Sequence, residues 1–339
     1  MEMSDFAKKV YPLLEKAEGK QIQIFPHARV DGDCVGTAVA LAAALGKLDL
    51  DASVILECEI PPRLAFMQVP DSMLTVISED NQEEIIKKQG VAFAVDCSEG
   101  SRMGGAQAIF DQAATKVVID HHVSSNMESE YTYVQARSAS CAELMYLFLR
   151  ELESISGKTL LDRFIADCLM VGIQSDSGKF SYENTKASTF RIAADLMELG
   201  ANVTDNAYHL FDETSEGKVL LHGQALSGMK LYADGRIAIT KITRAMMEQT
   251  RAPEGAADGV VNVLRDIDSV LAAFVIRENE DGVLRVNCRT KVGFDAAAFA
   301  QTFGGGGHHR AAGFNSKDMS IDEFEKTIVE RATAYLEQE

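Results

Sequence analysis

The chain has 339 residues, of which 46% are hydrophobic, 25% charged and 7% aromatic, and its formal net charge is −18. At roughly 150 residues per domain this length suggests about two domains, and the apolar content argues against a disordered or fibrous protein. The most apolar runs, such as VAFAV at 91–95, are far shorter than the about 20 residues that span a bilayer. The charged amino-terminal stretch shows no secretory signal, so we expect a cytoplasmic protein without membrane association.

Charge is unevenly distributed along the chain. Residues 1–216 contain 18 basic and 34 acidic side chains, whereas residues 217–339 contain 15 and 17. An acidic surface repels polyanions, which disfavours a long nucleic-acid duplex as a partner and requires that a phosphate-bearing ligand be small and held by local cations. Acidic charge also simply keeps proteins soluble, so it identifies no partner. The six cysteines include no C-x-x-C pair, as expected for reduced thiols.

The first half of the chain alternates short apolar strands with helices, as its residue pattern indicates. We expect strands at 21–27, 52–57, 74–78, 91–99 and 115–122, and helices at 10–20, 34–48, 100–113, 138–153 and 159–173. This alternation is typical of βαβ units and predicts a mostly parallel sheet with flanking helices.

The second half changes character. Residues 186–221 have a helical pattern, strands return at 235–243, 269–279 and 282–291, and helices are expected at 295–302 and 321–339. The predicted fold is therefore α/β, with a domain at 1–200, a helical linker at 201–222 and a smaller α/β domain at 223–339. No internal repeats are present.

Three expected strands end on acidic or imidazole residues, at His27, at Asp96 and at Asp120-His121-His122. Ligands of open α/β sheets bind outside the carboxyl ends of the strands, so these distant residues can share one site. Adjacent histidines after a strand point to opposite sides, which allows one to bind a metal while the other faces substrate.

Further ligand types occur in two loops. Asp31 and Asp33 follow His27 around a glycine, and Asp176 lies in the Gly/Ser-rich stretch GIQSDSG. The aspartates at 31 and 33 could instead only cap the next helix, and Asp96 could only begin a turn. Taken together, His27, Asp31, Asp33, Asp96, His121 and Asp176 suffice for two metal ions if one carboxylate bridges them, and two ions can activate water for phosphoryl transfer. This donor set favours Mn²⁺, Mg²⁺ or Co²⁺ over structural zinc, and Cys34 and Cys97 are interpreted as core residues.

A glycine-rich stretch, FGGGGHHRAAG, lies in the second half. Its glycines would let backbone amides approach an anion, with His308 and Arg310 as further donors, although a flexible hinge is the alternative. It lacks the Lys-Ser/Thr of a Walker loop, so nucleoside-triphosphate hydrolysis is unsupported. Arg289 is either a second anion contact or an exposed strand residue.

Five stretches in this order, HARVDGDCVG, AVDCSEG, VVIDHH, GIQSDSG and FGGGGHHRAAG, resemble the motifs of the DHH phosphoesterase superfamily and its DHH-associated C-terminal domain. The resemblance covers nearly the whole chain. By length and domain pairing the chain is similar to the compact nanoRNase/pAp phosphatase members, which include cyclic-di-AMP and pApA phosphodiesterases.

The resemblance implies roles for individual residues. His27 and Asp31, with Asp96 as the bridge, would hold one ion, with Mn²⁺ preferred, and Asp33, Asp96, His121 and Asp176 would hold the other. His122 would face the scissile phosphate and Asp120 would orient a histidine. In the second domain, across a cleft, the distal nucleotide would be held by Arg289, Gly305, Gly306, Gly307 and His308, with His309 as an alternative to His308.

The expected activity is metal-dependent hydrolysis of short oligoribonucleotides such as pApA to mononucleotides, and of pAp to AMP. The alternatives are a cyclic-di-AMP phosphodiesterase, a single-strand exonuclease of the RecJ type, a family II-type pyrophosphatase and a non-catalytic nucleotide sensor. The glycine-histidine signature argues against the pyrophosphatase, the lack of a basic track against the exonuclease, and the complete ligand set against the sensor. The family also suggests a homodimer. The native metal, the cleavage direction and the physiological substrate stay open.

Overall fold

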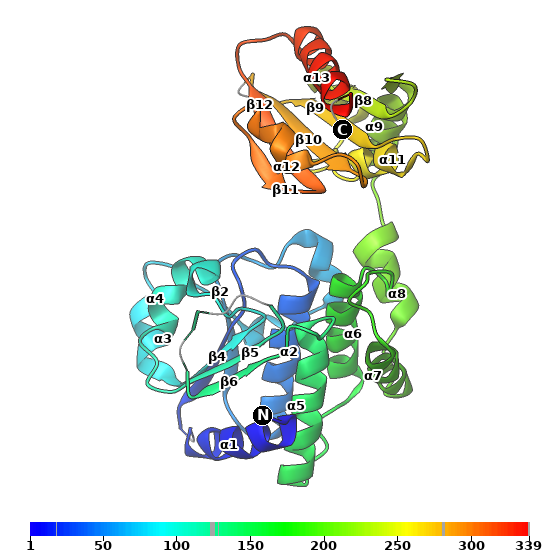
Figure 1. The fold of residues 1–339 in the computed structure, drawn as a ribbon. Helices are drawn as coiled ribbons and strands as arrows, with labels where there is room; N and C mark the ends of the chain where they lie inside the picture. The colour runs from blue at the N-terminus through cyan, green and yellow to red at the C-terminus, as the bar shows by residue number, and fades with distance from the viewer. Residues whose placement is uncertain (18, 123–125, 128, 280–281, 338–339) are drawn as a thin grey trace. The chain divides into compact units, whose positions relative to one another are not determined.

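The structure is a computed structural model that describes residues 1–17, 19–122, 126–127, 129–279 and 282–337. It divides into two compact units, Met1–Glu213 and Thr214–Glu339, and each has its own sheet and hydrophobic core (Figure 1). The predicted fold class, a largely parallel α/β domain followed by a smaller α/β domain, is confirmed.

The first unit is built on a parallel sheet. Its six described strands run in the spatial order β3-β2-β1-β4-β5-β6, and each neighbouring pair is parallel. Crossovers on both sides of β1 are the arrangement that opens a binding site at the carboxyl ends of the central strands. The strands are β1 (Gln21–Phe25), β2 (Ala52–Leu56), β3 (Leu74–Val76), β4 (Gln89–Val95), β5 (Lys116–Asp120) and β6 (Tyr131–Val134).

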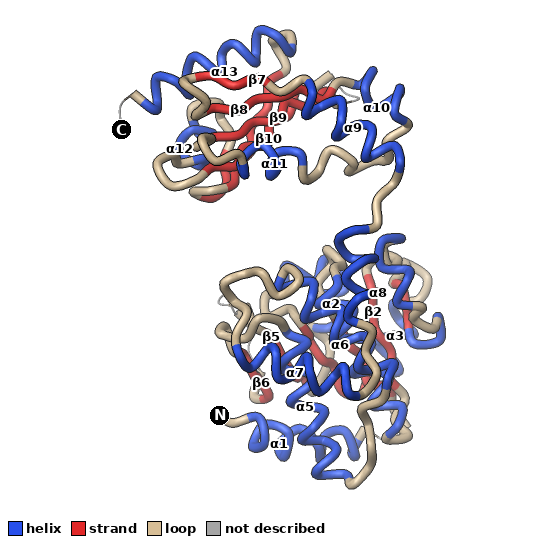
Figure 2. Tube along the Cα trace, turned by 90° about the vertical axis from the view of Figure 1, so that its right-hand side faces the viewer, coloured by secondary structure: helices blue, strands red, loops and turns tan. Residues whose placement is uncertain are grey.

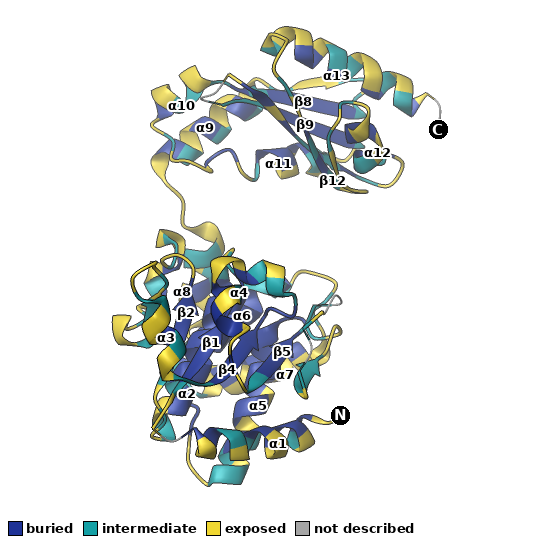
Figure 3. Cartoon of the chain, turned by 90° about the vertical axis from the view of Figure 1, so that its left-hand side faces the viewer, coloured by how far each residue is buried: buried dark blue, intermediate teal, exposed yellow. Residues whose placement is uncertain are grey.

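Helices cover both faces of this sheet, so its central strands are buried (Figures 1 and 3). Ile24 and Phe93 pack on one side against a helical layer, and Phe25 and Ala92 pack on the other against Phe110 and its neighbours. The first layer contains α1 (Met3–Lys16), α2 (Gly32–Lys47), α5 (Cys141–Ser156) and α6 (Arg163–Ser177), and the second contains α3 (Gln82–Lys88), η3 (Gly100–Ala106) and α4 (Gln107–Phe110). The unit also includes η1 (Pro62–Met67), η2 (Asp71–Met73), α7 (Ala187–Glu198), α8 (Val203–Ala207) and η4 (Tyr208–Asp212).

The second unit is a mixed sheet with helices on both faces (Figure 2). The strand order is β11-β12-β10-β9-β8-β7, and of these pairs β8 and β9 are parallel while the others are antiparallel. The strands are β7 (Lys230–Tyr232), β8 (Ile237–Ile242), β9 (Ala272–Glu278), β10 (Leu284–Thr290), β11 (Gly306–His308) and β12 (Ala311–Ser316). One face is covered by α9 (Glu216–Ser227), α10 (Arg244–Thr250) and α11 (Val260–Asp266), and the other by α12 (Ala296–Gln301) and α13 (Ile321–Leu336).

Several elements differ from the sequence prediction. The first helix begins at Met3 instead of residue 10, because Phe6, Val10 and Leu14 recur every four residues and are fully buried. The predicted helix at 100–113 is divided into η3 and α4, and Gly104, whose φ is +60°, interrupts the helical conformation within η3. Residues 18, 338 and 339 of the predicted terminal helices lie outside the described residues.

The glycine-rich stretch is also more ordered than a loop. Gly306–His308 pairs with Ala311–Gly313 as an antiparallel hairpin. A Cβ on Gly307, whose φ is +148°, would lie 2.4 Å from the Ala311 carbonyl oxygen, so close packing of this hairpin requires glycine there.

Among the described helices, none combines the length and the apolar character needed to cross a membrane.

Candidate metal centre

The carboxyl ends of β1, β4 and β5 meet the start of α2 and the end of α6 at one place in the first unit. The eight acidic and imidazole side chains predicted there from the sequence form a set of close contacts. We name this set the carboxylate–imidazole cluster: His27, Asp31, Asp33, Asp96, Asp120, His121, His122 and Asp176.

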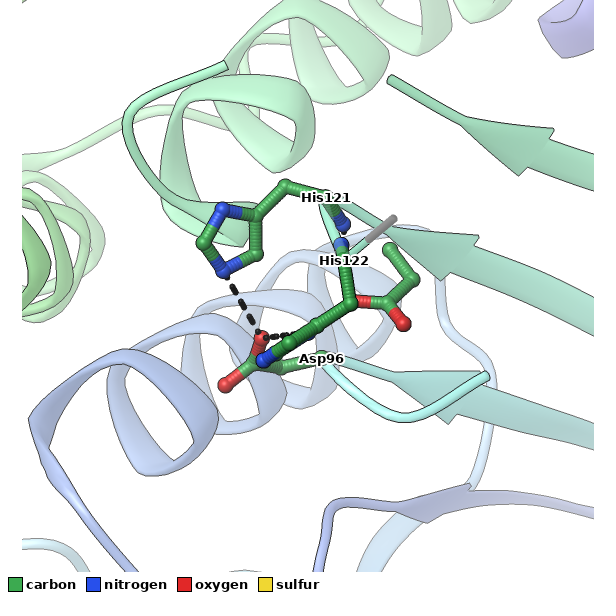
Figure 4. Close-up of side chains that lie close together, drawn as sticks. Asp96, His121 and His122 are labelled. Atoms are coloured by element: carbon green, nitrogen blue, oxygen red, sulfur yellow. Dashed lines mark hydrogen bonds and ion pairs between the residues drawn. The ribbon is translucent and has the colours of Figure 1, made fainter. Parts of the chain in front are cut away.

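Asp96 lies at the centre of the cluster, directly after β4, with only 1% of its surface exposed. Its Oδ2 is 3.3 Å from Nε2 of His27, while its Oδ1 is 3.3 Å from Nε2 of His121 and 3.5 Å from Nδ1 of His122. Figure 4 shows the carboxylate between the two histidine rings. The two oxygens therefore face two different groups of ligands, as a bridging carboxylate requires.

Asp31 caps a helix and faces a histidine at the same time. Its Oδ1 accepts hydrogen bonds from the amides of Asp33 and Cys34 in the first turn of α2, and its Oδ2 lies 3.4 Å from His27 Nε2. Capping uses only one carboxylate oxygen, so Asp31 caps α2 while its Oδ2 stays available for the predicted ligand role.

A second group forms around His121. Its Nε2 lies 3.3 Å from Asp96 Oδ1, 3.3 Å from Asp176 Oδ2 and 3.7 Å from Asp33 Oδ2. The sequence predicted Asp176 in a loop, but it belongs to the last turn of α6. The helix continues to Ser177 and ends at Gly178 in the left-handed conformation.

Asp33 is fully buried, and burial of its carboxylate without hydrogen-bond partners would destabilise the fold. The amides of Cys141 and Ala142 donate to its two oxygens at 2.6 and 2.9 Å. Both amides lie in the first turn of α5, where the helix dipole stabilises negative charge. The sequence prediction did not include this contribution, because the two segments are more than 100 residues apart.

His122 is held by Asp120 at the end of β5. Asp120 Oδ1 accepts from His122 Nδ1 at 2.7 Å and from the amides of His121 and His122. Burial opposes ionisation of Asp120, but the hydrogen bonds from His122 and Ser98 lower its pKa to about 2. Because Nδ1 of His122 is engaged by Asp120, Nε2 is the ring nitrogen that remains available to a ligand. The His122 side chain is 32% exposed. Neither Ser98 nor its bond could be identified from the motif pattern.

The charges of the cluster compensate one another only in part. Burial and the neighbouring Asp96 and Asp176 charges raise the pKa of Asp33 well above its usual range. Burial, together with Asp96 and Asp31, also raises the pKa of Asp176. Burial disfavours charged His121, yet the carboxylates of Asp176 and Asp96, each 3.3 Å from its Nε2, raise its pKa to about 11. Bound cations would offset the repulsion between carboxylates that raises the pKa of Asp33 and Asp176.

The donor atoms fit divalent metal ions. His27 Nδ1, Asp96 Oδ1, Asp120 Oδ2 and His121 Nε2 are buried without a hydrogen-bond partner in the described structure. Metal bonds of about 2.1 Å place neighbouring ligand atoms about 3 Å apart, and the contacts around His121 Nε2 are 3.3 to 3.7 Å. Cys34 lies beside His27 and Asp31, but burial raises its thiol pKa to about 12, so it remains protonated.

The predicted substrate-binding residues Arg289 and His308 of the second unit lie on the two strands that flank β12. Arg289 on β10 and His308 on β11 are both paired with Ala311 of the intervening β12, so they project from the same face of the sheet. Of the two adjacent histidines, His309 is bonded through Nδ1 to Asp295 at 2.6 Å, which leaves His308 as the better candidate.

The glycines of this hairpin have two separate functions in the fold. The Gly305 amide donates to the Ala300 carbonyl oxygen at 2.9 Å, so it is not free to bind an anion. A Cβ at Gly305 would lie 2.3 Å from the Gly313 oxygen, whereas one at Gly306 would meet nothing within 4 Å. Gly306 is therefore the member of the set whose surroundings are open to a ligand.

The two-unit fold and the cluster at the carboxyl ends of its parallel strands define the class of protein. The chain belongs to the DHH family: residues 21–173 match the DHH family, N-terminal domain, and residues 234–338 match the DHHA1 domain. The family prediction made from the five motifs is confirmed.

Relatives share the full length of the chain. It is 27% identical over 323 residues to the bifunctional oligoribonuclease and PAP phosphatase NrnA of Thermus thermophilus, covering 95% of this chain and 91% of that protein. It is 24% identical to the protein of the same name from Bacillus subtilis, covering 92% and 94%. A solved structure of an exopolyphosphatase-related protein from Bacteroides fragilis has the same fold, with a TM-score of 0.81, 23% identity and 98% of both chains covered.

Proposed function

We propose that the chain is a metal-dependent phosphoesterase that hydrolyses short oligoribonucleotides such as pApA to mononucleotides, and 3′,5′-bisphosphates such as pAp to AMP. The position of Asp96, with one oxygen toward His27 and the other toward His121, is the observation that carries this proposal. The names of the full-length relatives, oligoribonuclease and PAP phosphatase, support the choice of substrate.

The metal ligands divide into two groups in this proposal. His27, Asp31 and Asp96 would hold one divalent ion, and Asp33, Asp96, His121 and Asp176 would hold the other. When bound, two such ions, with Mn²⁺ as our proposed metal, would lower the pKa of a water molecule and offset charge on the phosphoryl oxygens. A carboxylate and imidazole set without thiolate is compatible with Mn²⁺, Mg²⁺ and Co²⁺.

The remaining residues bind and orient the substrate. Asp120 fixes the His122 ring through Nδ1, so Nε2 can donate a proton to the departing ribose oxygen. In the second unit, Arg289 and His308 bind a terminal phosphate or base, and Gly306 and Gly307 permit close approach of the hairpin backbone. We assign catalysis to Met1–Glu213 and this second contact to Thr214–Glu339.

Removal of the bridging carboxylate tests the proposal. Asp96→Asn should lower metal-dependent hydrolysis of pApA and pAp by at least a hundredfold, because it removes the negative charge and replaces one of the two oxygens by an NH2 group that cannot bind a cation. Asp111→Asn removes an exposed carboxylate at the end of α4 and should leave the rate unchanged. Retention of activity in Asp96→Asn would contradict the two-ion arrangement.

A substrate series separates this activity from its nearest alternative. The chain is 22% identical to the cyclic-di-AMP phosphodiesterase PdeA of Listeria monocytogenes and spans 48% of that protein. Products from pAp, cyclic di-AMP and adenylates of two to ten nucleotides, with Mn²⁺, Mg²⁺ or Co²⁺ added, would give the length preference, direction and metal. Turnover of cyclic di-AMP alone would favour the alternative.

Cytoplasmic location and a homodimer remain predictions. Sedimentation would measure the oligomeric state.

A further inference from the structure

A hollow of about 920 Å³ lies on the second unit, away from the Arg289 end of β10. Three arginines line it: Arg244 begins α10, Arg277 lies near the end of β9, and Arg285 lies near the start of β10. The lining thus combines three guanidinium groups with four carboxylates.

Two of these arginines are held side by side. Arg277 and Arg285 are directly paired across β9 and β10, so their side chains share one face of the sheet. Like charges in such a cross-strand position repel each other. Arg277 has a buried Nε without a hydrogen-bond partner in the described structure, and its Nη1 is 3.6 Å from Asp258. Among the described residues, no carboxylate forms the close bidentate pair with either arginine that usually compensates a guanidinium group.

The hollow also contains acceptors. Asp258, Glu248 and Glu254 line it, and Glu278 accepts a hydrogen bond from the Arg244 amide at 3.1 Å. A ligand that fits this lining combines an anionic group for the arginines with hydroxyl or amino groups for the carboxylates. A nucleotide has both, since its phosphate is anionic and its ribose and base donate hydrogen bonds.

The same face of β10 connects the hollow to the Arg289 end. Leu284, Val286 and Cys288 point into the core beneath α12 and α13, so the alternate residues Arg285, Asn287 and Arg289 point to the opposite face, on which α11 also packs. On that face Arg285 is exposed, and Asn287 and Arg289 are half-buried. At about 3.3 Å per residue, Arg285 and Arg289 are about 13 Å apart along the strand. A stacked nucleic-acid strand rises about 3.4 Å per nucleotide, so this separation corresponds to up to about four nucleotide steps.

We propose that the hollow at Arg277 and Arg285 is a distal phosphate subsite for oligonucleotides of about four to five residues. The inference rests on the proposed function, because it takes Arg289 as the contact for the nearer part of the same substrate. A dinucleotide held at Arg289 does not reach Arg285, whereas a pentanucleotide does. The subsite thus gives the enzyme a preference for oligonucleotides longer than two residues.

Equilibrium binding tests the subsite without catalysis. The full chain is titrated in EDTA with a fluorescent 5′-phosphorylated adenylate pentanucleotide, and unlabelled pApA is measured by competition. We expect the pentanucleotide to bind at least tenfold more tightly than pApA. Arg285→Ala should weaken pentanucleotide binding five- to tenfold and reduce the slope of log K against log salt by about 0.7, the value for one single-strand phosphate contact.

Matched variants make the result specific. Arg265→Ala removes one positive charge from α11 of the same unit, where Arg265 is paired with Asp266, and should change neither affinity nor salt slope. Arg285→Lys retains the charge and should restore most of the slope. Arg285 is exposed, so its replacement tests the subsite even if Arg277→Ala disturbs packing.

Two results would overturn the subsite: equal affinity for pApA and the pentanucleotide, or equal losses in Arg285→Ala and Arg265→Ala. The proposed function fails separately. Length-dependent binding that requires Arg285, in a protein that hydrolyses neither pApA nor pAp, would retain the subsite and reject the activity. Hydrolysis of both with no effect of Arg285→Ala would do the reverse.

Discussion

Asp96 has a backbone conformation that few residue types adopt readily. Its φ is +53°, in the left-handed region, where aspartate and asparagine are found more often than other non-glycine residues. Glycine would fit this backbone but would supply no carboxylate. This position thus needs a residue that tolerates the turn after β4 and also supplies two oxygens to the cluster, and aspartate does both.

Asp120 provides a prediction for a residue that acts through another side chain. Asp120→Asn keeps the size of the side chain but replaces the carboxylate that accepts from His122 Nδ1. We expect kcat for pApA to fall about 10- to 100-fold, as when groups that orient functional histidines are replaced. KM and Mn²⁺ affinity should change much less. A large loss of metal affinity, measured by calorimetric titration, would instead place Asp120 among the ligands.

The motifs located the proposed ligands but not the groups that compensate their charge. His27, Asp96 and His121 could be predicted because each ends an apolar strand, and parallel strands share one functional edge. The amides that compensate Asp33 could not be predicted, because they belong to the start of α5. They follow Asp33 by 108 and 109 positions in the sequence. Such contacts depend on how helices pack, which local periodicity does not specify.

At the scale of elements, the approach of α2 to α6 positions Asp33 beside Asp176. Gly36 allows it, because a Cβ there would lie 2.3 Å from the Cys168 carbonyl oxygen on α6. Gly36→Ala should therefore destabilise the first unit by about 1–3 kcal/mol, as overpacking does, and weaken metal binding. Gly46→Ala, in the same helix with nothing within 4 Å, should stabilise it by up to about 1 kcal/mol. Thermal unfolding of both variants measures the contrast, and equal effects would contradict it.

Glu325 joins α13 to the sheet of the second unit. Lys230 and Lys241 lie 2.9 and 2.7 Å from its two oxygens, and the Tyr232 hydroxyl donates at 2.8 Å. Burial opposes ionisation, but these bonds lower the pKa of Glu325 from 4.5 to about 2. A lowered folded-state pKa means that this stabilisation is complete above about pH 4.5 and is lost as the pH falls toward 2.

Replacement of Glu325 tests this linkage. Glu325→Gln should destabilise the second unit by about 1–3 kcal/mol at pH 7, since two lysines lose a buried partner, and should reduce the decline in its melting temperature between pH 4.5 and 2. Glu330→Gln, on the same helix with its carboxylate 3.9 Å from Lys326, is the control. An identical acid profile in wild type and Glu325→Gln would show that the lysine contacts contribute little.

For the whole molecule, the alternation of strands and helices was enough to predict two α/β domains. Short elements were missed: β6 and β7 have four and three residues, and α10 and α11 have seven each. Elements this short show little periodicity and form because they pair with a neighbouring strand, as β6 and β7 do, or pack against neighbouring elements, as α10 and α11 do. The glycine-rich hairpin was missed for another reason, since its strands consist of residues chosen for close backbone packing and not for strand propensity.

The uneven charge of the molecule gives a final prediction about metal removal. The acidic excess lies in residues 1–216, and the carboxylate–imidazole cluster is in the first unit. With two separate cores, calorimetry should resolve two unfolding transitions, and Gly36→Ala identifies the first unit by shifting one of them. Mn²⁺ at a hundred times its dissociation constant should stabilise that transition by about 2.7 kcal/mol for each bound ion, and a chelator should reverse the gain. A shift confined to the other transition would place the metal in the second unit and contradict the proposed centre.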